Sequence, residues 1–109
     1  MKYYKRWIGD YMKDTAHLNL MDHGAYAVLL DIYYANGLPL PASHKVLYRM
    51  AGCQDDDEKS SVSRIADEFF PICKDDGLRH NCRADREIRE AIDYAIKQSA
   101  KAAARWQKT

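Results

Sequence analysis

Residues 43–82 decide the fold of this chain and read SHKVLYRMAGCQDDDEKSSVSRIADEFFPICKDDGLRHNC. Ser43 is a candidate N-cap, and Gly52 is a candidate C-cap about two turns later. Between them three apolar residues fall at helical spacing: Val46, Leu47 and Met50. The stretch therefore begins with a predicted short helix.

A longer amphipathic helix is predicted after Gly52. Four carboxylates would occupy its first turn, where the positive end of the helix dipole favours them: Asp55, Asp56, Asp57 and Glu58. Apolar residues then recur at i, i+3, i+4, i+7 and i+8, a core-facing stripe: Val62, Ile65, Ala66, Phe69 and Phe70. Pro71 cannot continue the helix, so we expect the helix to end before it.

A β-hairpin is predicted after Pro71. Asp76-Gly77 supplies the positive φ values of a tight turn, and it is flanked by residues 72–74 and 78–82. Two short-linked helices, an amphipathic helix and a hairpin, in that order, are typical of a winged helix-turn-helix. We therefore predict a mainly α fold with a small β-hairpin, in which the hairpin is the wing and the preceding helix faces the DNA major groove.

The flanks of this core predict further helices. Residues 1–18 are rich in aromatic residues and turn formers, which indicates an extra N-terminal arm and one short helix. Residues 19–82 are expected to form the helical core with the wing. The first helix of this core starts near Asn19, is expected to be buried on most sides, and ends at the left-handed cap Asn36-Gly37. Residues 83–109 predict a long C-terminal helix.

Length and composition limit the class of protein. The chain has 109 residues, of which 47% are hydrophobic and 30% charged, so we expect a single folded domain. Its longest apolar runs are too short to span a membrane, and its start lacks the apolar stretch of a signal peptide. The three cysteines include no Cys-x-x-Cys pair, which favours free thiols and a cytoplasmic location.

The net charge of +1 is too small for DNA binding by bulk charge, so the placement of the cations matters. The winged-helix interpretation gives a set of candidate DNA contacts on three elements: Lys45, Arg49, Lys59, Ser60, Ser63 and Arg64 on the core helices, Lys74, Arg79 and His80 on the hairpin, and Lys97, Lys101, Arg105 and Lys108 on the C-terminal helix. The hairpin and the C-terminal helix form the leading contact surface. The partner could be double- or single-stranded DNA.

The acidic turn supports a different function. Phosphates would be repelled by the four carboxylates at the start of the presumed recognition helix: Asp55, Asp56, Asp57 and Glu58. The same fold could instead serve as a protein-interaction module, with this acidic turn as its docking face. Such a module would act in self-association to a homo-oligomer, or in recruitment of another protein.

Catalytic and metal chemistry find little support in the sequence. No nucleophile motif, phosphate-binding glycine loop or His-Glu-x-x-His pattern is present, so we expect no enzyme. Cys53, Cys73, His80 and Cys82 lack the close ligand pairs of common zinc sites, so we expect no metal and no cofactor. Asp31 falls within the most apolar helix, where a buried carboxylate would require a partner.

A series of short motifs resembles the YdaU-like family of phage and prophage proteins: Gly9-Asp10-Tyr11, Asp14-Thr15, His17-Leu18, Gly24-Ala25-Tyr26, Leu29-Leu30-Asp31, Tyr33-Tyr34 and Pro39-Leu40-Pro41. The resemblance continues through Phe69-Phe70, Asp76-Gly77 and Arg105-Trp106. It implies the N-terminal domain of a longer protein that acts in phage replication initiation or replisome organisation. For the protein-interaction alternative, it implies a host replication protein as the partner that is recruited. It also implies that this chain is a fragment or a short member, and it assigns no catalytic residue.

Overall fold

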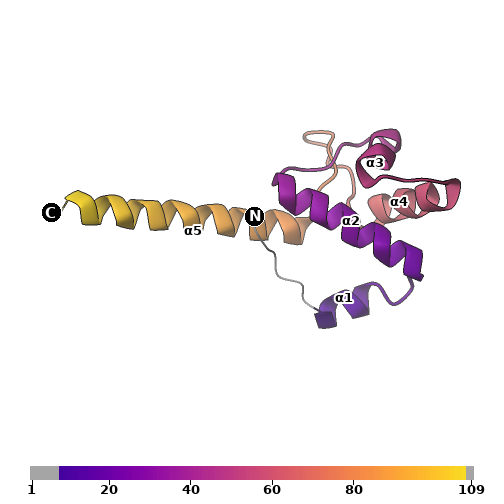
Figure 1. The fold of residues 1–109 in the computed structure, drawn as a ribbon, viewed down its shortest axis with the longest axis horizontal. Helices are drawn as coiled ribbons and strands as arrows, with labels where there is room; N and C mark the ends of the chain where they lie inside the picture. The colour runs from indigo at the N-terminus through magenta and orange to yellow at the C-terminus, as the bar shows by residue number, and fades with distance from the viewer. Residues whose placement is uncertain (1–7, 108–109) are drawn as a thin grey trace.

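Five helices make up the regular secondary structure of residues 8–107, the part of the chain that the computed structural model describes. They are α1 (Ile8–Asp14), α2 (Leu20–Asn36), α3 (His44–Ala51), α4 (Asp56–Phe69) and α5 (Cys82–Gln107), shown in Figure 1. The predicted N-terminal arm lies outside the described residues, as does Lys108. The predicted short helix after the arm is confirmed as α1.

The predicted ends of the core helices are confirmed. Asn19 and Asp22 form a capping box at the start of α2, and Gly37 ends that helix with φ 64°. The Ser43 side chain accepts a hydrogen bond from the backbone of the third helical residue of α3, and Gly52 closes α3 with φ 74°. The capping residues therefore set the ends of α2 and α3, and with them the positions of the side chains on these helices.

Helix α4 also begins as predicted. The Asp55 side chain accepts a hydrogen bond from the Glu58 backbone N–H at 2.9 Å, so the acidic residues do occupy the first turn. At the other end the Phe70 N–H still donates to the Ala66 carbonyl, and Pro71 follows. Asp55 thus has a structural role as the N-cap of α4, and the three acidic residues after it form the first turn.

The core lies where α4 packs against α2 and α3, with the first turns of α5 against α2. Its largest fully buried apolar side chains come from α2, α3, α4 and the connecting loops: Leu29, Tyr33, Leu40, Leu47, Ile65 and Phe70. Each such side chain contributes about 1.5 to 3 kcal/mol by leaving water. Four residues of the predicted α4 stripe are buried, and Phe69 packs against them while half-buried.

The predicted β-hairpin, and with it the winged helix, is wrong. Residues 70–81 form an irregular loop whose only pairings within the described chain are two isolated bridges, Ile72 with Arg79 and Leu40 with Arg79. Gly77 does take a positive φ of 69°, so the turn exists. The ladder does not extend, because Pro71 has no N–H to donate to His80, and the Leu78 N–H donates to the Asp76 side chain rather than to the Cys73 carbonyl.

Two expectations for α2 are also wrong. The helix is not buried on most sides, because Leu20, Met21 and Val28 stay exposed and line an apolar hollow of about 600 Å³ beside α4. Asp31 is exposed, and the buried carboxylate of this helix is Asp22. Both errors arise because helical spacing shows which residues share a helix face, but not which other element packs against that face.

Helix α5 extends far beyond the core, as Figure 1 shows, and it makes the molecule 62 Å long against 30 and 26 Å in the other directions. Ala84 and Ile88 are buried against the core, whereas every described residue after Ala91 whose side chain can be assessed is exposed. The predicted long C-terminal helix is therefore confirmed. No helix in the described part of the chain is long and apolar enough to cross a membrane.

Candidate functional site

The predicted recognition face of α4 is largely occupied by contacts within the protein. Arg64 donates to the buried Asp22 carboxylate at 2.6 Å, and Ser63 shares a 2.5 Å hydrogen bond with the Tyr48 hydroxyl of α3. Ser60 is exposed. Two of the predicted contact residues thus turn toward α2 and α3 rather than outward, because α4 lies between these helices.

The Arg64 contact belongs to a network that the sequence analysis missed. Asp22 also accepts a hydrogen bond from the Ser61 hydroxyl at 2.7 Å, and both residues are buried. Burial raises the pKa of Asp22, but the hydrogen bonds from Ser61, Arg64 and the Asn19 backbone outweigh it and hold this pKa below its usual value. The available signal was the capping pattern Asn19-x-x-Asp22.

The cations predicted on the wing have three different positions. Lys74 is exposed on the loop. Arg79 is only 3% exposed, and its guanidinium donates to the carbonyls of Ala42 and Phe70 and pairs with Asp67. His80 is half-buried between two carboxylates. Of these three residues, Lys74 is the one that is exposed, and Arg79 fastens the loop to the core.

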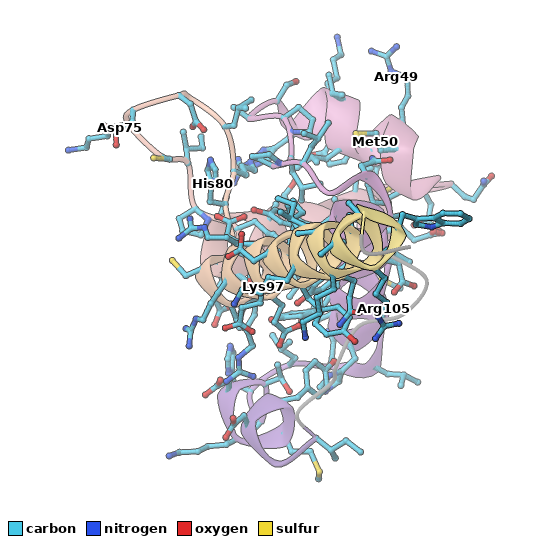
Figure 2. The ribbon with its side chains drawn as sticks, turned by 90° about the vertical axis from the view of Figure 1, so that its left-hand side faces the viewer. Arg49, Met50, Asp75, His80, Lys97 and Arg105 are labelled. Atoms are coloured by element: carbon cyan, nitrogen blue, oxygen red, sulfur yellow. The ribbon has the colours of Figure 1, made fainter. Side chains whose placement is uncertain are left out.

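Three predicted residues do come together, in a basic hollow between α3 and the start of α4. Lys45 and Arg49 of α3 and Lys59 of α4 line this hollow of about 590 Å³, with the Tyr48 ring among them. The Lys59 Nζ lies 5.9 Å from the centre of that ring, which favours a cation–π contact. Figure 2 shows Arg49 extending into solvent above the core. The lining residues of the described chain include no carboxylate.

The acidic turn lies next to this hollow. Asp56 and Asp57 are exposed, Asp55 is the cap of α4, and Glu58 reaches the Gln54 backbone at 3.5 Å. The Glu58 side chain faces the apolar hollow on the other side of the helix start. The acidic residues thus lie in the cap and first turn of α4, at the edge of the basic hollow.

The cations of α5 do not share a face with the loop. Lys97, Lys101 and Arg105 are exposed and spaced four residues apart, so they follow one side of the helix. In Figure 2, which looks along α5, Lys97 and Arg105 extend below the helix, whereas His80 and Arg49 lie above it. Lys97 and Arg105 of α5 and His80 of the loop, all named as candidate DNA contacts, therefore lie on opposite sides of the α5 axis in this view.

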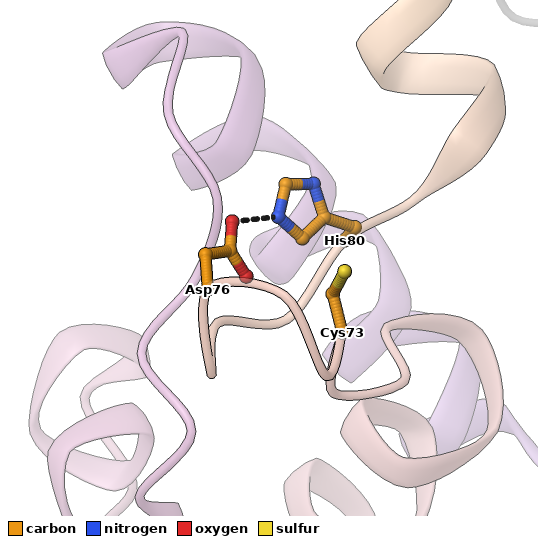
Figure 3. Close-up of side chains that lie close together, drawn as sticks. All are labelled: Cys73, Asp76 and His80. Carbon is orange, nitrogen blue, oxygen red and sulfur yellow. Dashed lines mark hydrogen bonds and ion pairs between the residues drawn. The ribbon is translucent and has the colours of Figure 1, made fainter.

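The loop gathers a different cluster, shown in Figure 3. The ligand atoms of Cys73, Asp76 and His80 all lie within 4.8 Å of one another. Hydrogen bonds to Asp85 and Asp76 raise the pKa of His80 above its usual value. Cys82, which was considered with Cys73 and His80 in the sequence, is exposed and lies outside this cluster.

The comparisons with known proteins place the chain in a family. The model of a family described as "Protein of unknown function (DUF1376)" matches residues 2–89. The uncharacterized protein YdaU of Escherichia coli strain K12 is 28% identical over 100 residues, which is 92% of this chain and 33% of that protein, so the chain spans about a third of its relative. No solved structure matches the chain. The chain belongs to the DUF1376 family.

Proposed function

We propose that this chain is a nucleic-acid-binding module without catalytic activity, and that the basic hollow holds the phosphate backbone. The observation that carries the proposal is the convergence of Lys45, Arg49 and Lys59 from two helices on one concave surface. Phosphate contacts of this kind position a nucleic acid without reading its sequence. The resemblance to YdaU-like phage proteins adds the proposal that this binding serves replication initiation or replisome organisation.

The hollow suits a polyanion better than the other candidate surfaces do. Its three cations are half-buried or exposed and converge on one space, whereas Arg64 and Arg79 are already paired with carboxylates. The Tyr48 ring beside them offers a flat surface to a base or sugar. A site with three cations and one aromatic ring predicts modest affinity and strong dependence on salt.

The salt dependence can be calculated from the number of cations. Three neutralised phosphates give a slope of log affinity against log salt of about −2.7 for duplex DNA and about −2 for a single strand. Between about 50 and 200 mM salt, the affinity should fall about 40-fold for the duplex and about 20-fold for the single strand. The slope on each strand form thus measures how many cations bind, and the ratio of the two affinities gives the preferred strand form.

Fluorescence polarisation with labelled duplex and single-stranded oligonucleotides tests the proposal. The double variant Arg49→Gln/Lys59→Gln should lose most of the affinity and bring the slope to about −0.9. The matched control Lys97→Gln/Lys101→Gln removes the same charge from α5 and should leave both values close to those of the parent. The proposal fails if the folded chain shows no binding at low salt, or if the control variant loses affinity and the hollow variant keeps it.

As a second candidate function we propose self-association through α5, a different docking surface from the acidic turn of the protein-interaction alternative, and one observation supports it. The exposed half of the helix carries an uncharged apolar row on one face: Ile92, Ala95, Ile96, Ser99, Ala102 and Ala103. Residues 97–107 contain three cations and no carboxylate, whereas residues 84–96 contain four carboxylates and two arginines. An antiparallel pair of α5 helices would therefore join opposite charges, so the proposed partner is a second copy of this chain.

A further inference from the structure

The loop between α4 and α5 brings a thiol, a carboxylate and an imidazole to one point. Cys73, Asp76 and His80 lie within a span of eight residues, and their ligand atoms lie within 4.8 Å of one another. A tight turn makes this possible, because the Cys73 backbone pairs with both Leu78 and Gly77 at 2.8 and 2.9 Å. Figure 3 shows the Cys73 sulfur and the Asp76 carboxylate on the same side of the loop as the His80 ring.

The His80 ring is held in place by the core rather than by the loop alone. Its Nδ1 lies 2.8 Å from Oδ2 of Asp85, and the other oxygen of Asp85 accepts a hydrogen bond from the fully buried Tyr33 hydroxyl. The remaining nitrogen, Nε2, then faces the cluster, where it lies 2.6 Å from Oδ2 of Asp76. A carboxylate on one ring nitrogen is the arrangement that orients metal-binding histidines through the other.

We propose that Cys73, Asp76 and His80 bind one Zn²⁺ ion, with Asp85 as the positioning residue for His80. Thiolate and imidazole are ligands that Zn²⁺ prefers, whereas Mg²⁺ and Ca²⁺ select oxygen ligands. Three protein ligands leave a fourth tetrahedral position for water. This site lies on a different element from the basic hollow, so it stands or falls independently of the proposed function.

The observed spacing is close to what a tetrahedral ion requires. With zinc–ligand bonds of about 2.0 to 2.3 Å, the ligand atoms must lie about 3.3 to 3.8 Å apart. The longer distances therefore have to shorten by about 1.5 Å at most, and the 2.6 Å distance between His80 Nε2 and Asp76 Oδ2 has to lengthen by about 0.7 Å. Asp76 lies in the exposed segment of residues 74–78, which can move that far without disturbing the core. The proton between His80 and Asp76 would give way to the ion, and the Cys73 thiol would lose its proton on binding.

Titration of the reduced chain with Zn²⁺ by calorimetry, and with Co²⁺ by absorption spectroscopy, tests the site. We expect one equivalent of metal, a thiolate-to-cobalt charge-transfer band, and no comparable heat with Mg²⁺. Cys73→Ser should abolish the band, and Cys73→Ser and His80→Gln should each weaken the affinity at least tenfold. Cys82→Ser is the matched control, because it removes an exposed thiol outside the cluster and should change nothing.

The positioning role needs its own variant. Asp85→Asn should weaken metal binding about 10- to 100-fold while the charge-transfer band remains, because Cys73 still binds. Since Asp85 also contacts Tyr33, circular dichroism must show that this variant is folded, and Asp76→Asn on the exposed loop provides a substitution that does not touch the core. The proposal is overturned if the folded parent chain binds neither metal, or if Cys73→Ser leaves the affinity and the band unchanged. It is equally overturned if Cys82→Ser weakens binding as much as Cys73→Ser does.

Discussion

Replacing Asp22 by Asn should destabilise the fold in a manner that depends on pH. The Asp22 carboxylate is 6% exposed and accepts hydrogen bonds from Ser61 at 2.7 Å and Arg64 at 2.6 Å, so it joins α2 to α4. Hydrogen bonds to a charged group contribute about 1.5 to 3 kcal/mol each when buried. Arg64 is more than half exposed, so its share falls below about 1 kcal/mol. Because the amide oxygen can still accept from Ser61, we expect a loss of about 2 kcal/mol near neutral pH.

The sign of the pH dependence follows from the lowered pKa of Asp22 in the folded state. In the unfolded chain the pKa of an Asp side chain is about 3.9, so the Asp22 carboxylate stabilises the fold to its full extent above that pH. It is lost as the pH falls through the lower folded-state pKa, where the folded protein also takes up the proton. The Asn variant does not titrate at this position. The difference in stability between parent and variant should therefore narrow as the solution becomes acidic.

Urea denaturation of parent and variant, at a series of pH values from neutral to acidic, measures this difference. All other carboxylates are shared and cancel in the comparison. Asp93→Asn, which removes an exposed carboxylate from the projecting part of α5, is the control and should stay within about 0.5 kcal/mol of the parent at every pH. A gap that is independent of pH, or that widens in acid, would refute the assignment of Asp22 as an ionised buried partner.

Two further predictions concern the loop and the terminal helix. Arg79→Met should lower stability by about 3 kcal/mol, because the carbonyls of Ala42 and Phe70 lose their donors, whereas Lys74→Met on the same loop should change it by less than about 0.5 kcal/mol; thermal denaturation compares the two. In light scattering, the parent chain should dimerise as its concentration rises, and Ile96→Glu should keep it monomeric. Tyr94→Glu is the matched control, because Tyr94 lies off the apolar row and is about as exposed as Ile96, 66% against 62%. This variant should still dimerise. A parent chain that is monomeric at every concentration would exclude pairing through α5.

The helices could be predicted because their signals are local. Ser43, Asp55 and Gly37 each act on the backbone within a few residues, so the sequence alone contains the interaction that the structure uses. The apolar stripe of α4 was found for the same reason. What the stripe could not give was the identity of its neighbours, so Asp31 was placed in the core and Asp22, a cap residue, was not.

The hairpin was predicted wrongly because an Asp-Gly pair specifies a turn and not a ladder. Gly77 takes the expected conformation, yet strands of useful length also need free N–H and C=O groups on both sides. Pro71 has no N–H to donate to His80, and the Leu78 N–H donates to the Asp76 side chain within the turn, so the ladder stops after one bridge on this side. The buried position of Arg79 is thus a tertiary effect, and its basic character alone suggested a surface contact.

The candidate sites show the same difference between local signals, which the sequence contains, and tertiary contacts, which only the structure reveals. Lys45, Arg49 and Lys59 were named from the sequence, but only the packing of α3 against α4 shows that they line one hollow. For the loop cluster, Cys73 and His80 were considered together, and Asp76 was seen only as part of the turn. The spacing Cys-x-x-Asp-x-x-x-His was the available signal, and it has meaning only once the turn folds these residues back on one another.

The buried polar contacts of α2 connect the core with the chemistry of the loop. Asp22 in the first turn of this helix reaches Ser61 of α4, and Tyr33, about three turns later, reaches Asp85 of α5. A buried polar group requires its partner, so these two contacts restrict the placement of α4 and α5 more tightly than apolar packing, which tolerates small shifts. Because Asp85 also holds His80, a rotation of α5 about Tyr33 would move the imidazole relative to Cys73. The position of the His80 imidazole is therefore fixed by the core, through a chain of hydrogen bonds that begins at a fully buried tyrosine, and the exposed Asp76 can adjust to it.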